Sequence, residues 1–249
     1  MRKILIANFK MNTTPSAFKS YAMTLATKGR HSKNEIIVCP PYTHLYMAKD
    51  MLGGTNIAYG AQNISEDEKG ELTGEISACM IKDLGASYVI IGSSERRAKF
   101  KENDKTINKK IKTALANGLK VILCVGENMQ AKENKQGCAF VKAQLEEDLR
   151  GIYENELEGV VIAYEPVWAL GSGKNATSKE IEKIVDAIRK EVAYLYSEKT
   201  GSGVNVVYGG QVSLSNYKKL LASEKINGLL VGTACLDVDN FAIICKESY

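Results

Sequence analysis

Short apolar runs recur along the whole chain, and this alternation restricts the possible folds more than any other feature of the sequence. They occur at residues 4–7, 36–39, 57–61, 88–91, 121–125, 160–164, 204–208 and 228–231. Each run is apolar at consecutive positions, as is typical of parallel strands that are covered on both faces. Parallel neighbours need long crossover connections, so the pattern predicts a helix between successive strands.

The segments between the runs show the spacing of amphipathic helices. Residues 103–117 place Ile107, Ile111 and Ala114 on one face, and residues 178–197 carry a similar apolar stripe. Strands that alternate with helices in this number over about 250 residues predict an α/β fold, a (β/α)8 barrel that forms a single domain over residues 1–249. A doubly wound dinucleotide-binding fold would carry G-x-G-x-x-G after the first strand, where this chain reads NFKMN.

Composition argues against several classes of protein. Lys and Arg total 33 against 29 acidic residues, a net charge of +4 that is spread along the chain and does not favour a nucleic-acid partner. The first apolar run is too short for the core of a signal peptide, and no stretch approaches the length of a membrane span. The six cysteines form no C-x-x-C pair, so we expect reduced thiols in a cytoplasmic protein with no metal site and no cofactor.

Sites in such barrels lie at the carboxyl ends of the strands, so the residues directly after each run are the candidates. These residues are Asn8 and Lys10, then Ser93, Ser94 and Glu95, then Glu165, then Gly209, Gly210 and Gln211, and finally Gly232 and Thr233. A carboxylate, an ammonium and glycine-rich turns on one rim favour an anionic substrate held by backbone N–H groups. Taken singly, Glu165 could cap a helix and Lys10 could be a surface charge. Their position on the same rim of the barrel favours a binding site instead.

Several motifs stand in a characteristic order along the chain. They are NFKMN, GAQN (60–63), ELTGE (71–75), SERR (94–97), CVGE (124–127), YEPVWALGSGK (164–174) and YGG (208–210). In order and spacing they resemble the triosephosphate isomerase family over the whole chain, and YEPVWALGSGK is highly specific. The resemblance implies a cytoplasmic isomerase of glycolysis and gluconeogenesis that interconverts dihydroxyacetone phosphate and glyceraldehyde 3-phosphate through an enediolate.

The resemblance also implies a role for each matching residue. Glu165 corresponds to the base that moves a proton between adjacent carbons, and Lys10 would stabilise the charges of the enediolate and the phosphate. Asn8 would hold the substrate oxygens, and Glu95 would be the acidic partner that orders the site. Gly171 would close over the phosphate together with the lid.

The sequence departs from the family at three positions in one pocket. Ser93 stands where the family has a histidine that donates to the substrate oxygens, Gln211 replaces a serine, and Thr233 replaces a glycine. The two histidines of the chain are His31, in the polar turn before the second strand, and His44, after the second strand. We expect His31 at the wrong end of the barrel for catalysis, and a solvated or capping role for His44.

Two of these departures fall where the phosphate is expected. The implied donors to it are the backbone N–H groups of Gly171, Gln211, Gly232 and Thr233. A β-branched residue adds bulk where the backbone approaches the phosphate, and it disfavours positive φ. We therefore expect phosphate-bearing analogues to bind weakly, and Thr233→Gly to tighten binding more than Gln211→Ser.

Two classes of function remain open on the sequence alone. In the first, the protein is an isomerase whose activity is low or lost, because one missing donor to an oxyanion typically costs about 10²–10³ in rate. An alternative within this class is an isomerase that acts on another phosphorylated sugar, which Gln211 would accommodate. In the second, the barrel is catalytically silent and binds a ligand or a partner subunit. The complete lid motif favours the first class, and the altered phosphate-binding residues favour the second.

The polar segment SEDEKGELTGE, residues 65–75, is long for a connection after a short strand. Taken by itself, it is a solvated surface loop. The resemblance implies instead that the loop, with Thr73 near its tip, inserts beside the active site of a second copy. We therefore expect a twofold homodimer.

Overall fold

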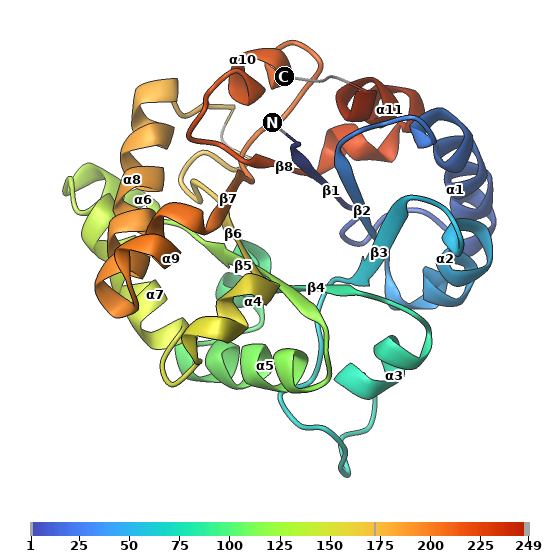
Figure 1. Ribbon diagram of the computed structural model, residues 1–249, viewed down its shortest axis with the longest axis horizontal. Coiled ribbons are helices and arrows are strands. Elements are labelled where there is room, and N and C mark those ends of the chain that lie inside the picture. The colour runs from blue at the N-terminus through green and yellow to red at the C-terminus, as the bar shows by residue number, and fades with distance from the viewer. Residues whose placement is uncertain (1, 172, 247–249) are drawn as a thin grey trace.

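Eight parallel strands close into a barrel in chain order, and β8 pairs with β1. The structure is a computed structural model that describes residues 2–171 and 173–246. The strands are β1 (Ile4–Asn8), β2 (Glu35–Cys39), β3 (Ile57–Ala61), β4 (Tyr88–Ile91), β5 (Lys120–Val125), β6 (Val160–Tyr164), β7 (Asn205–Tyr208) and β8 (Gly228–Val231). Figure 1 shows the strands as an inner ring with the helices around them. The prediction of a single (β/α)8 barrel is confirmed.

The helices form the outer layer, and polar side chains define where several of them begin. They are α1 (Pro15–Gly29), α2 (Leu45–Leu52), α3 (Ala78–Asp83), α4 (Ser94–Lys99), α5 (Asp104–Ala116), α6 (Met129–Glu133), α7 (Gly137–Asp148), α8 (Ser178–Leu195), α9 (Glu198–Gly203), α10 (Tyr217–Leu221) and α11 (Val238–Lys246), with 3-10 turns η1 (Tyr42–His44), η2 (Glu154–Gly159) and η3 (Thr233–Leu236). Thr14, Asn103 and Thr177 each accept a backbone N–H of the first turn that follows. Such caps satisfy donors that have no partner inside the helix.

Alternate residues of each strand belong to two separate groups of buried side chains. In β1, Leu5 and Ala7 pack outward among the helices, whereas Ile4 and Ile6 point into the barrel. The interior group is Ile4, Ile6, Ile37, Cys39, Tyr88, Ile90, Ile122, Cys124, Val161, Ala163, Val207 and Leu230. Because side chains fill the interior, the barrel is a packed core that holds the strand ends in fixed positions.

The strand and helix boundaries differ from the predicted ones by a few residues at most. The predicted strand 204–208 begins one residue later, because Val204 ends α9 and its N–H bonds to the carbonyl of Thr200 at 2.9 Å. The predicted helix 103–117 loses one residue at each end, since Asn103 is its N-cap. The predicted helix 178–197 ends at Leu195.

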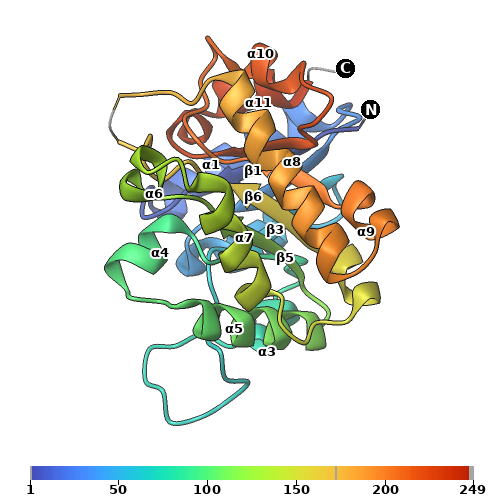
Figure 2. The ribbon, with the colours of Figure 1, turned by 90° about the vertical axis from the view of Figure 1, so that its left-hand side faces the viewer.

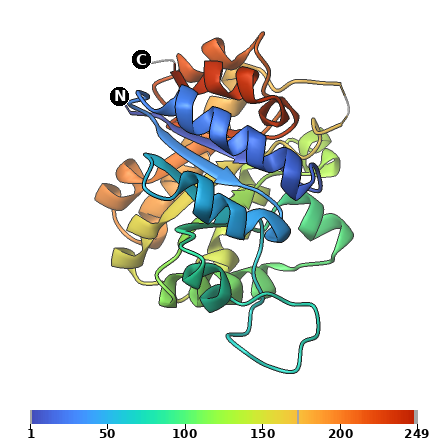
Figure 3. The same cartoon turned by 90° about the vertical axis from the view of Figure 1, so that its right-hand side faces the viewer.

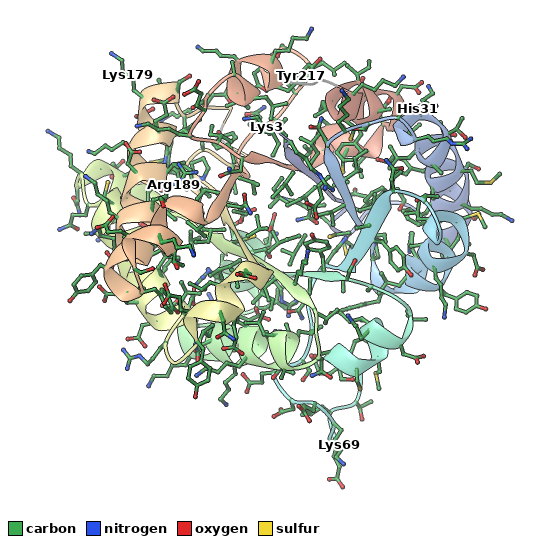
Figure 4. All side chains as sticks on the ribbon, viewed as in Figure 1. Lys3, His31, Lys69, Lys179, Arg189 and Tyr217 are labelled. Atoms are coloured by element: carbon green, nitrogen blue, oxygen red, sulfur yellow. The ribbon has the colours of Figure 1, made fainter. Side chains whose placement is uncertain are left out.

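The connection after β3 leaves the body of the molecule. Residues 67–75 are exposed, and the base of the loop is closed by a bond from the Ser65 N–H to the Ile76 carbonyl at 2.8 Å. Figures 2 and 3 show this loop below the barrel, away from every other segment. Figure 4 places Lys69 at its tip. Among the described helices, none combines the length and the apolar character needed to cross a membrane.

Candidate active site

The carboxyl ends of the strands surround a cavity of about 860 Å³. Its lining includes nearly all the residues predicted from the sequence, namely Asn8, Lys10, Glu95, Glu165, Gly171, Gln211, Gly232 and Thr233. Residues that follow five different strands therefore meet at one place, as the barrel geometry requires. Ser93 is the predicted residue that does not line the cavity, whereas its neighbour Ser94 does.

Lys10 reaches the cavity from a left-handed backbone conformation. Its φ is 52°, a region that residues other than glycine rarely adopt. The Asn8 Oδ1 accepts the Lys10 N–H at 3.1 Å. The Gln62 amide donates to the carbonyls of Lys10 at 3.0 Å and Cys39 at 2.9 Å. These bonds hold the strained residue and so fix where the ammonium lies.

The Lys10 ammonium forms an ion pair with the Glu95 carboxylate across the mouth of the site. Both side chains are partly exposed, at 41% and 35%. Burial opposes the charge on Lys10, but the hydrogen bond and the charge of Glu95 outweigh it and raise the pKa of Lys10. Burial likewise opposes the charge on Glu95, and Lys10 outweighs it and lowers the pKa of Glu95. Both groups are therefore charged at neutral pH.

Glu165 lies deeper than this pair. It is 3% exposed, and its Oε2 accepts the backbone N–H of Ser94 at 2.9 Å. Burial, and then the charge of Glu95, raise the pKa of Glu165 to about 7, against the opposing effects of the Ser94 N–H and Lys10. A carboxylate with a pKa near the working pH is suited to general-base catalysis, because it takes and returns a proton with little cost in either direction.

Gly209 allows Glu165 to take this position. A Cβ built on Gly209 would lie 2.9 Å from the Cγ of Glu165, closer than real Cβ contacts come. On Gly210 it would lie 2.2 Å from the Oη of Tyr208. The two glycines after β7 therefore make room for the carboxylate side chain and for the tyrosine behind it.

Ser93 is the N-cap of α4, but its hydroxyl forms no capping bond. The residue is 7% exposed and buried behind the cavity wall. Ser93 is not among the residues that line the cavity, and its catalytic role stays a prediction. The backbone N–H of Ser94, one residue later, is what contacts Glu165.

Neither His31 nor His44 lines the cavity. His31 is exposed, in the turn after α1, and Figure 4 shows it on the outside of the molecule. His44 is 2% exposed, not solvated as expected, and it packs edge-on against Phe18 at 5.4 Å between ring centroids. Its ring nitrogens lie 3.1 Å from the Thr13 hydroxyl and 2.8 Å from the Thr43 hydroxyl. His44 occupies the N-cap position of α2 without a side-chain capping bond, and it does not line the cavity.

The backbone-strain argument against Thr233 is wrong. Thr233 is the first residue of η3, and it is not among the described residues with positive φ. A β-branched side chain is unstrained there. Two glycines line the cavity nearby. They are Gly232, which precedes Thr233, and Gly171, whose φ is 69°. Ser172, the next residue of the lid motif, lies outside the described residues.

Sequence reasoning assigned no role to Glu127, which anchors the lid. Its Oε1 accepts the Trp168 indole N–H at 2.7 Å and the Tyr164 hydroxyl at 3.0 Å, and the residue is 2% exposed. Glu127 lies two positions after β5, so the rule applied to the other strand ends would have found it. In the described part of the chain, no three His, Cys, Asp or Glu side chains are grouped as a metal site would need.

The closed parallel barrel, with a buried carboxylate and an ammonium in one cavity, defines a (β/α)8-barrel protein with an acid–base site at the strand ends. A sequence model described as triosephosphate isomerase matches residues 3–248. The chain belongs to the triosephosphate isomerase family.

Relatives and a solved structure agree with this assignment over nearly the full length. A triosephosphate isomerase of Caldanaerobacter subterraneus subsp. tengcongensis is 43% identical over 243 residues, which is 98% of each chain. A triosephosphate isomerase of Carboxydothermus hydrogenoformans is 42% identical over 250 residues, or 100% of both. The crystal structure of triosephosphate isomerase from Bartonella henselae is 36% identical, with a TM-score of 0.89 over 98% of both chains.

Proposed function

We propose that this protein interconverts dihydroxyacetone phosphate and glyceraldehyde 3-phosphate. The observation that carries the proposal is the buried Glu165, whose pKa is raised to about 7, in one cavity with the Lys10–Glu95 pair. Membership of the triosephosphate isomerase family over residues 3–248 supports the same reaction. As in the family, the cytoplasm is the expected place of action.

In the proposed reaction, Glu165 removes a proton from one carbon of the substrate and returns it to the neighbouring carbon. The carbonyl oxygen becomes negative in the intermediate enediolate, and the Lys10 ammonium offsets that charge. The proton of the adjacent hydroxyl passes to this oxygen, so that the hydroxyl and the carbonyl exchange places. Asn8 lines the same cavity and positions the substrate oxygens. Glu95 keeps the Lys10 ammonium oriented through their ion pair.

The substrate phosphate would lie on the backbone at the other side of the cavity. Four residues line this side, and each carries a backbone N–H that could donate to the phosphate: Gly171, Gln211, Gly232 and Thr233. Helix-end and turn N–H groups bind phosphate without an arginine. The proposal therefore needs no cationic side chain besides Lys10.

We further propose that turnover is lower than in relatives with the family histidine. Ser93 offers no imidazole, so one donor to the developing oxyanion is missing, an effect typically of about 10²–10³ in rate. The proton base and the ammonium remain, which leaves a working isomerase. If the protein shows no isomerase activity at all, the alternative holds, namely a catalytically silent barrel that binds a ligand or a partner subunit.

A coupled assay with both triose phosphates tests the proposal. We expect turnover that disappears in Glu165→Gln and persists in Glu146→Gln, a matched change at an exposed carboxylate of α7. Equal activity in the unmodified protein and Glu165→Gln, or no activity in either, would rule out Glu165-dependent isomerisation. Turnover of another phosphorylated sugar alone would show that the substrate differs.

A further inference from the structure

One lysine contacts Trp168 in the lid, the segment of residues 166–177 between β6 and α8, and also Glu180, three residues beyond the end of the lid. Lys132 belongs to the short helix α6 (Met129–Glu133). Figure 2 shows α6 below the yellow-orange segment that leads into α8. The contacts of Lys132 reach Trp168, near the start of the lid, and Glu180, in the first turn of α8.

At the start of the lid, Trp168 is held from two directions. Its indole N–H donates to Glu127 at 2.7 Å, and the residue is 8% exposed. The Lys132 ammonium lies over the indole ring, 4.3 Å from its centroid. At this distance the ring's electron density attracts the cation.

Just beyond the end of the lid, the same ammonium pairs with Glu180. The Oε2 of Glu180 accepts the Thr177 N–H and hydroxyl, each at 2.8 Å, and the Thr177 hydroxyl accepts the Glu180 N–H at 3.3 Å. Lys132, followed by the Thr177 N–H, lowers the pKa of Glu180 to about 2. The Glu180 carboxylate is therefore charged throughout the physiological pH range.

Two glycines lie between Trp168 and Thr177 in the lid. Gly171 and Gly173 both have positive φ, at 69° and 72°, and a Cβ on either would meet nothing within 4 Å. On either side of these glycines, one cation links Trp168 to Glu180. An exposed ion pair alone contributes little, so the notable feature is that this charge is shared between two points that flank the cavity-lining glycines.

We propose that Lys132 is a positioning residue that ties the two ends of the lid together and so preorganises it to close over an anionic ligand. The proposal rests on the phosphate-binding function proposed above. Its physical basis is that a loop held at both ends has less conformational freedom to lose when it closes. Lys132 itself does not line the cavity.

The first test uses Trp168, the single tryptophan of the chain, as a reporter. In the ligand-free protein, Lys132→Met keeps the aliphatic stem but removes the cation, and we expect the acrylamide quenching constant to rise about twofold as the ring loosens. Lys132→Arg should leave the quenching constant of the unmodified protein unchanged, because arginine keeps the ring contact and the ion pair. Lys142→Met on α7, whose lysine pairs with Glu191 away from the lid, is the matched control. Quenching that is equal in Lys132→Met and the control overturns the proposal.

The second test asks whether Lys132 and Glu180 form one link between the ends of the lid, called the clamp here, or whether Lys132 only covers the Trp168 ring. Glu180→Gln removes only the charge, since glutamine also completes a capping box with Thr177. We expect Lys132→Met and Glu180→Gln each to raise the Kd of 2-phosphoglycolate about two- to fivefold. The double variant should bind no more weakly than either single variant, because both break one link. An unchanged or lower Kd, or additive losses, overturns the clamp.

The two tests also separate this inference from the proposed function. If the unmodified protein does not bind 2-phosphoglycolate at millimolar concentration, the phosphate site is wrong. The quenching experiment then still decides whether Lys132 restrains the lid, because it needs neither ligand nor turnover.

Discussion

Glu165 and Glu95 are carboxylates of one cavity with opposite pKa shifts. Glu95 meets the Lys10 ammonium and its pKa falls, whereas Glu165 is buried against a single backbone N–H and its pKa rises to about 7. Environment rather than residue type therefore assigns the roles, with Glu165 as the proton carrier and Glu95 as a fixed charge.

The raised pKa of Glu165 predicts how activity depends on pH. A carboxylate accepts a proton only when ionised, so kcat/KM should rise with pH and level off above an apparent pKa near 7. The substrate phosphate, with a pKa near 6, adds a second ionisation that a fit must include. Because the folded protein keeps the Glu165 proton to a higher pH than the unfolded chain, this group also destabilises the fold as pH rises from 4.5 to about 7. A flat kcat/KM profile between pH 5 and 8 would contradict this assignment.

A histidine at position 93 tests the proposed low turnover at the level of one residue. Ser93→His places a longer donor at the N-cap of α4, where it can extend past the position of the buried serine. We expect kcat to rise about tenfold or more in the coupled assay. Ser93→Phe, which adds similar bulk without a donor, should give no gain. An equal effect of both substitutions would mean that packing at the strand end, not the donor, limits the rate.

At the level of elements, the strands were predictable and the finer geometry was not. Consecutive apolar residues mark a parallel strand on the sequence itself, so every strand was found to within a residue or so. The short α6, α9 and α10 have too few residues to show a helical period. The positive φ of Lys10 and the burial of His44 depend on partners distant in sequence, such as Gln62 and Thr13. No local pattern encodes them.

The conformation of η3 changes the prediction for the phosphate side of the cavity. Thr233 already has ordinary backbone angles, so Thr233→Gly relieves no strain. We now expect it to change the Kd of 2-phosphoglycolate less than about twofold, a change similar to that of Gln211→Ser, as measured by calorimetric titration. Tightening of about tenfold by Thr233→Gly alone would show that the threonine side chain itself blocks the ligand.

At the level of the whole molecule, the loop of residues 65–75 extends from the barrel, and its residues 67–75 are exposed. Leu72 in this loop is 45% exposed, and the loop extends well beyond the barrel (Figure 3). A long, ordered extension of this kind suits insertion into a second copy, so we propose a homodimer with Thr73 at its interface.

Sedimentation at micromolar concentration tests the dimer. The unmodified protein should sediment as a dimer, and Thr73→Arg should shift it toward monomer, because a bulky charge does not fit a closely packed interface. Thr27→Arg, on the exposed face of α1, should leave the dimer intact. A monomer in every sample would remove the proposed interface.

The barrel interior and the strand ends are made by different residues of the same strands. Interior side chains such as Ile90 and Ile122 hold the wall, whereas Ser93 and Ser94 lie two and three residues beyond the end of β4 at Ile91. Neither Ser93 nor Ser94 belongs to the interior group of buried side chains. We expect the residue at position 93 to be exchangeable through single changes, with a folded protein at every step. The architecture thus gives the site mutational freedom that a catalytic group inside the packed wall would not have.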